Sequence, residues 1–170
     1  MRQVYKIKKA LIAPMILAVL LSVPVFVDVI RTGHTTRVLF MASLLMVLFY
    51  LFTLNNLLKR IIIEDSVILI RSLFGTARIP LEEIKLVDAV TMGSRQFITI
   101  SAKKNSYIAN TFDDFSGIIE SIQAVVKDEN IGKGLLEMKG HVVTRRSDIT
   151  MAWITVILLA IIVVIRFFPF

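Results

Sequence analysis

The segment KRIIIEDSVILIRSLFGTARIPLEEI, from Lys59 to Ile84, decides the fold of this chain. It begins where a long apolar run ends, at Leu58. Short runs of β-branched residues alternate with Asp, Ser and Gly, which are the residues that turn chains. The pattern predicts a meander of antiparallel strands. A bend is expected near Glu82 and Glu83, where the alternation of inward and outward residues restarts.

The strand pattern continues through QFITISAK and YIANTF and then changes to a helical period in DDFSGIIESIQAVVKDEN. Asp113 or Asp114 is placed to cap that helix. We therefore expect residues 59–130 to form a small β-barrel or half-open sandwich capped by one C-terminal helix. Residues 131–148 are expected to be a connector, and the sequence leaves open whether they hold a short strand or an interfacial turn.

Three apolar blocks account for a composition that is 56% hydrophobic. They span residues 10–30, 38–58 and 149–168, each about 20 residues, which is the length that crosses a bilayer as a helix. The chain is thus expected to be an α+β membrane protein with a tail and two transmembrane helices in residues 1–58. The β domain follows, and a third helix occupies 149–170. The alternative of a cleaved signal peptide fits poorly, because the first block is too long and lacks an A-x-A site.

Basic residues near the ends of the apolar blocks predict the orientation. Eight lie in the N-terminal tail and beside the middle segment, against three on the other side, so the tail and middle segment should be cytoplasmic and the C-terminus outside. The middle segment is nearly neutral, with thirteen basic and twelve acidic residues, so the net charge of +7 predicts no nucleic-acid partner. The residues expected to face anionic lipid are Lys6, Lys8, Lys9, Lys59, Arg60, Arg145 and Arg146.

The stretch RIIIEDSVILIRSLFGTARIPLEEIKLVDAV resembles the opening of the bacterial pleckstrin-homology (PH-like) domains. In those domains a polar turn follows the first of these strands, a Gly-containing turn follows the next, and the third begins R-x-I-P-L-x-x-I. Arg78, Ile79, Pro80, Leu81 and Ile84 resemble that last motif, although Arg78 directly precedes Ile79 with no residue between them. FDDFSGIIESIQ is similar to the closing helix of the family. The resemblance covers about residues 59–130. It implies a binding or assembly platform on the bacterial inner membrane, and it implies no reaction.

The sequence predicts no enzyme, no metal and no cofactor. It has no cysteine, and its histidines, His34 and His141, are expected on opposite sides of the membrane. No Walker, G-x-S-x-G or H-x-x-x-H pattern occurs, and the stretch IGKG lacks the strand-to-helix setting that binds phosphate. We therefore expect a non-enzymatic accessory, scaffold or assembly subunit of a larger membrane complex. Its expected partners are membrane lipids and other integral membrane proteins. The sequence leaves open whether the chain also forms a homo-oligomer.

The sequence leaves two other functions open as alternatives. One is a sensor of lipid head groups, for which the candidate ligand or partner patch is Arg71, Arg78, Arg95, Lys103 and Lys104. The acidic first turn, EDS, argues against a phosphoinositide clamp there. The other is a small transport or channel component in which Asp28 faces a wet cavity. The preferred interpretation of Asp28 is an ion pair with Arg31 at the membrane interface.

Overall fold

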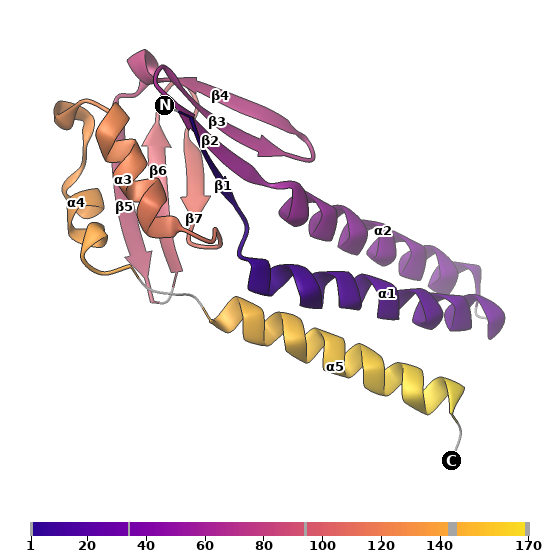
Figure 1. The fold of residues 1–170 in the computed structure, drawn as a ribbon. Helices are drawn as coiled ribbons and strands as arrows, with labels where there is room; N and C mark the ends of the chain where they lie inside the picture. Colours follow the sequence, from indigo (N-terminus) through magenta and orange to yellow (C-terminus); the bar gives the residue numbers. More distant parts are fainter. Residues whose placement is uncertain (1, 34, 94, 143–145, 169–170) are drawn as a thin grey trace. The chain divides into compact units, whose positions relative to one another are not determined.

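The structure is a computed structural model that describes residues 2–33, 35–93, 95–142 and 146–168 (Figure 1). The chain divides into two compact units. Met1–Lys8 and Leu58–Arg145 form a β domain, and Lys9–Leu57 and Arg146–Phe170 form a helical unit. Each unit is therefore built from segments that lie far apart in the sequence.

Among its described residues, the helical unit contains three helices that are long and apolar enough to cross a membrane. They are α1 (Lys9–Arg31), α2 (Thr36–Leu58) and α5 (Ser147–Phe167). This confirms the three predicted spans in length and composition. α1 packs against α5, and the Ser22 hydroxyl of α1 lies 3.1 Å from that of Tyr50 in α2. The buried side chains of α1 follow one stripe at helical spacing: Leu11, Pro14, Ala18 and Ser22.

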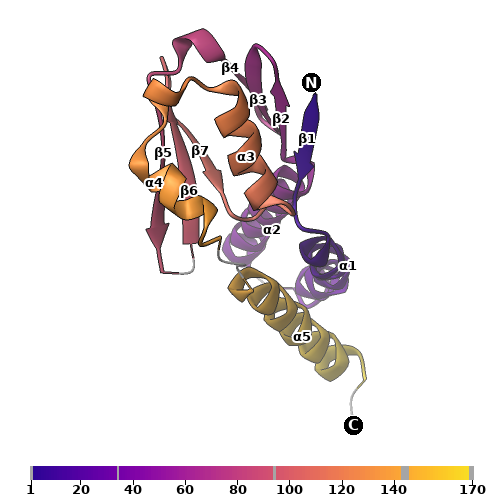
Figure 2. The ribbon, with the colours of Figure 1, turned by 60° about the vertical axis from the view of Figure 1, so that its left-hand side comes forward.

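The β domain contains two antiparallel sheets (Figure 2). The four-stranded sheet has the order β1 (Gln3–Lys6), β2 (Arg60–Glu64), β3 (Val67–Ser72) and β4 (Gly75–Pro80). The three-stranded sheet has the order β5 (Leu86–Met92), β6 (Arg95–Ser101) and β7 (Ser106–Ala109). The sheets do not close into a barrel, so that form of the prediction is wrong. The chain leaves the first sheet after β4 through the 3-10 turn η1 (Leu81–Glu83), where the bend was expected.

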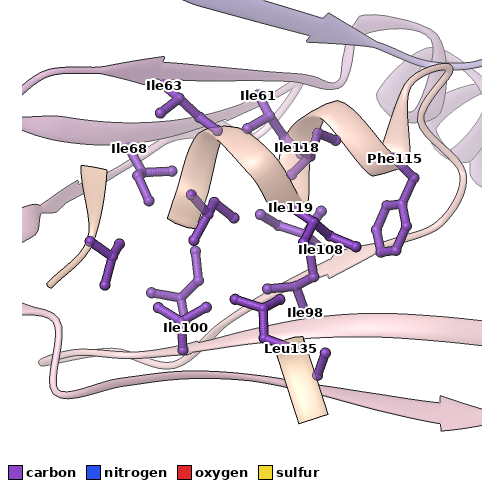
Figure 3. Packing of buried hydrophobic residues seen from close by; sticks show 14 of the residues in the cluster. Ile61, Ile63, Ile68, Ile98, Ile100, Ile108, Phe115, Ile118, Ile119 and Leu135 are labelled. Atoms are coloured by element: carbon purple, nitrogen blue, oxygen red, sulfur yellow. The ribbon is translucent and has the colours of Figure 1, made fainter. Parts of the chain in front are cut away.

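The core lies between the two sheets and helix α3 (Phe115–Val125). Figure 3 shows Ile118 and Ile119 of this helix between the isoleucines of β2 and β3 and those of β6 and β7. Apolar residues at helical spacing predicted this helix. Asp114 caps it by accepting a hydrogen bond from the Gly117 N–H at 2.8 Å. The largest contribution to the core comes from fully buried isoleucines, which are Ile61, Ile68, Ile98, Ile100, Ile108, Ile118, Ile119 and Ile122.

The first residues of the chain, treated above as a basic tail, form strand β1 of the domain. β1 pairs with β2 along its whole length, with Lys6 opposite Arg60. The Tyr5 hydroxyl donates to the Gly117 carbonyl at 2.8 Å and contacts Ser121, so it ties β1 to α3. Beyond the strand, the N–H of Asp113 donates to the Lys6 carbonyl at 2.9 Å. The N-terminal segment thus links the first sheet to the chain that follows β7.

The C-terminal part of the domain also extends past residue 130. After the short turn η2 (Asp128–Asn130), Ile131 forms a bridge to Val87, and helix α4 (Lys133–Lys139) packs against β5. Leu135 and Met138 of α4 are buried in the core. The expectation of one capping helix is therefore incomplete, because residues 131–139 supply a bridge to β5 and the helix α4 instead of a bare connector. Two buried side chains in seven residues are too weak a pattern to predict it.

Replacing Tyr5 with Phe should loosen the attachment of β1, because the ring keeps its packing while the hydroxyl loses its partners on α3. A hydrogen bond of this kind contributes about 0.5–1.5 kcal/mol. Amide hydrogen exchange of the full chain in mild detergent should speed up in β1 and in the first turn of α3 by up to about tenfold. The matched control is Val4→Ala, which alters an exposed side chain of the same strand and should leave these rates nearly unchanged. Equal exchange in both variants would contradict this role of Tyr5.

Candidate functional site

The outer face of the three-stranded sheet carries large apolar side chains that are exposed. Alternation along the strands explains it, because every second residue points into the core and the others must point away from it. The exposed apolar residues on this face are Leu86 (42% exposed), Val90 (49%), Met92 (67%) and Tyr107 (60%). Phe97 is half-buried and lies opposite Val90 on the neighbouring strand. These five residues are called the apolar face below.

The apolar face is unusual for the surface of a small domain. The exposed side chains of Val90 and Met92 lie beside Phe97 on the neighbouring strand, and clustered apolar surfaces of this kind mark interaction sites. The register places Val90 opposite Phe97, with Ala109 of β7 beyond it, so apolar side chains cross all three strands in one row. Polar groups interrupt the face, because Asp88 of β5 is opposite Thr99, which is opposite Tyr107. At its margins Arg95 is opposite Met92 and Ser101 is opposite Leu86. The sequence contained this alternation, but only the pairing of the strands shows that the apolar residues are neighbours.

The basic residues expected at the membrane surface lie at the start of the domain. Lys6 and Arg60 are cross-strand partners, and Lys9 begins α1. The Lys8 ammonium donates to the Asn110 carbonyl at 3.0 Å, and Lys59 lies between α2 and β2. At the other connection Arg146 is exposed directly before α5, whereas Arg145 lies outside the described residues.

The five residues of the candidate ligand or partner patch do not lie together. Arg71 and Arg78 belong to β3 and β4 of the four-stranded sheet. Arg95 begins β6, and Lys103 and Lys104 follow its other end, about 20 Å away at roughly 3.3 Å per residue. The Lys103 ammonium is also paired with the Glu83 carboxylate at 2.7 Å. The structure instead brings Arg71 beside Arg60, in the row Lys6–Arg60–Arg71 across three strands.

A cavity of about 510 Å³ lies between α4 and the ends of β5 and β6. Its lining consists of Ala89, Thr91, Gln96, Gly134, Glu137, Met138 and His141. The buried polar side chain in this lining is Gln96, whose amide nitrogen donates to the His141 carbonyl at 2.7 Å. That bond holds the chain after α4 against β6, which is a structural role. His34, the other histidine, lies outside the described residues.

Asp28 near the end of α1 has a different partner from the one predicted. Its carboxylate lies 3.5 Å from the Arg166 guanidinium of α5, so the ion pair joins two helices instead of two turns of α1. Arg166 lies far from Asp28 in the sequence, and only helix packing reveals the pair. The pair gives Asp28 a structural role in helix association. Across the described ranges, His, Asp and Glu form no group of three that is placed to hold a metal ion.

The glycines of the stretch IGKG have a packing role. Gly132 precedes α4 and its N–H donates to the Val87 carbonyl at 2.7 Å. At Gly134 an added Cβ would lie 2.2 Å from the Ala89 carbonyl oxygen and 2.7 Å from the Asp88 carboxylate. The absence of a side chain therefore lets α4 approach the backbone of β5 closely.

Replacing Gly134 with Ala should push α4 away from β5, because the contact is with backbone that cannot rotate aside. Overpacking of this kind costs about 1–3 kcal/mol. The Tm of the β domain, followed by circular dichroism of the detergent-purified chain, should fall by about 4–8 °C for each kcal/mol. Gly140→Ala is the control, since the nearest atom to its added Cβ is 4.0 Å away. A Gly134→Ala variant as stable as Gly140→Ala would refute the close approach.

Comparisons of the chain with protein-family models, with curated proteins and with solved structures find no match. The molecule is therefore characterised by its own geometry. It combines three long apolar helices with an α+β domain of two antiparallel sheets. Within that domain the apolar face and the row Lys6–Arg60–Arg71 are exposed.

Proposed function

We propose that this protein is a non-enzymatic docking subunit of a larger assembly in the bacterial inner membrane. Its β domain, which is PH-like in this proposal, presents the apolar face to a cytoplasmic segment of another integral membrane protein. The observation that carries the proposal is the exposure of Val90, Met92 and Tyr107 on one sheet face. Burying apolar surface away from water is favourable by roughly 25 cal/mol for each Å² of surface that is buried.

The PH-like assignment rests on the order of the elements. β2, β3 and β4 follow one another as a meander with Asp65 and Ser66 in the first turn and Gly75 after the second. The third of these strands ends in the residues Arg78 to Pro80, and α3 follows the last strand. The order of turns, strands and closing helix supports the resemblance, whereas the third strand ends with Arg78 to Pro80 instead of beginning there. In such domains the β scaffold supplies binding surfaces, which agrees with a docking role.

The connections between the domain and the helices favour a partner in the same membrane. Ile7 and Lys8 alone separate β1 from α1, and Lys59 alone separates α2 from β2. A domain held by two such short connections stays at the membrane surface and does not search the cytosol. A partner segment held at the same surface meets it at a high effective concentration. The positive-inside rule favours the cytoplasmic side for this surface.

A photo-crosslinking amino acid at position 90 or 107 should react with one membrane protein when the full chain is in its native membranes. The same group at position 136 on α4, an exposed leucine outside the apolar face, should give no such product. If crosslinks form only between two copies of this chain, the apolar face binds a second copy in a homo-oligomer and the proposed partner protein is wrong. Absence of any position-specific product would overturn the docking proposal.

A charge on the apolar face should weaken the same contact. When the Val90→Glu variant binds its partner, the new carboxylate must lose its water. This cost should lower the affinity for the partner by at least about tenfold, or 1.4 kcal/mol. Leu136→Glu is the matched control, because it adds the same charge at an exposed apolar position on α4. The measurement is the yield of the crosslinked partner after mild-detergent purification. Equal yields from the two variants would contradict a docking role for the apolar face.

A further inference from the structure

One end of the four-stranded sheet is the end at which the chain continues into α1 and α2. β1 runs toward this end and leads into α1, while β2 starts there after α2. β3 is antiparallel to β2 and runs back to the same end. The β3–β4 hairpin turn therefore lies beside the two helix connections. This follows from strand direction and register within the β domain.

A row of three cations crosses the sheet at this end. Lys6 pairs with Arg60, and Arg60 pairs with Arg71, so the three side chains come from adjacent strands in one register. Tyr5, Ile61 and Ile70 pack on the core side, and strand alternation therefore places the three cations on the outer side, where they are exposed.

Like charges directly opposite each other on adjacent strands repel, with Cβ atoms about 4.5–5.5 Å apart. Among the residues that the structure describes, none of these cations forms an ion pair with a carboxylate. An anionic partner would remove the repulsion.

The hairpin turn next to this row carries an exposed aromatic side chain. Ser72 and Gly75 are opposite each other, so Leu73 and Phe74 form the tip of the turn. Gly75 has φ +143°, a conformation that favours glycine and keeps the turn tight. The Phe74 ring is 74% exposed. An apolar ring at the tip of a tight hairpin, beside cations, is the composition of a segment that lies in a membrane interface.

We infer that this end of the four-stranded sheet binds the anionic phospholipid head groups of the bilayer that α1 and α2 cross. Lys6, Arg60 and Arg71 bind the lipid phosphates, and Phe74 enters the boundary between head groups and acyl chains. Anionic lipid is favoured over a protein partner because Lys6 and Arg60 lie within three residues of a membrane-length helix. This inference uses a different sheet from the apolar face and does not depend on the docking proposal.

The natural chain has no cysteine, so a single introduced thiol can be labelled without further changes. Phe74→Cys carries an environment-sensitive fluorophore in the full chain, reconstituted alone into nanodiscs. The discs contain phosphatidylcholine, with or without phosphatidylglycerol, and a lipid-borne quencher. Ser66→Cys is the matched control, because it lies in the β2–β3 turn at the opposite end of the same sheet. The label at position 74 should shift to the blue and be quenched several-fold more than the label at 66, most strongly with phosphatidylglycerol.

The cations are tested in the Phe74→Cys background. The triple change Lys6→Gln, Arg60→Gln and Arg71→Gln should abolish the extra quenching that phosphatidylglycerol produces. The control removes the same charge elsewhere, by Lys85→Gln, Lys103→Gln and Lys104→Gln near η1, and should keep that response. Similar quenching at positions 74 and 66 would overturn the lipid contact. A response to phosphatidylglycerol that survives the first triple change would overturn the role of the cationic row.

Discussion

The pairing of β1 with β2 is the constraint on which the rest of the β domain depends. It places Lys6 opposite Arg60, and each of these residues lies beside the start or end of a membrane-length helix. The two helix connections therefore leave the same end of the same sheet. Because strands are antiparallel, this pairing also sets which hairpin turn faces that end and which turn points away from it. Tyr5 secures the arrangement through its contacts with α3.

The two sheets share one core but have different outer faces. The three-stranded sheet presents apolar side chains, and the four-stranded sheet presents cations at the end where the helices connect. Strand alternation allows this division, because the isoleucines that fill the core leave every second position free for another purpose. In our proposals the first surface binds a protein and the second binds lipid. Binding of the second surface to the bilayer would hold the first in a defined orientation for its partner.

Local signals predicted much of the fold. The strands from Arg60 to Pro80, the bend at η1, the cap at Asp114 and the three apolar spans all follow from patterns within a few residues. Strand β1 was missed because QVYK is short and lies in a basic stretch, and its partner is more than fifty residues away. Helix α4 was missed because its burial depends on a close approach to β5 at Gly134. The pair Asp28–Arg166 likewise depends on helix packing.

By itself, the sequence determined the types of most elements, the three membrane-length helices and the nearly neutral charge of the middle segment. Each of these depends on residue chemistry within one segment. The tertiary structure alone decided which side chains become neighbours on a surface. It separated Arg95 and Lys103 to opposite ends of β6, and it joined Lys6, Arg60 and Arg71 into one row. The physical reason is register: a shift of one residue between paired strands would turn every side chain to the other face, and that register depends on contacts between distant segments.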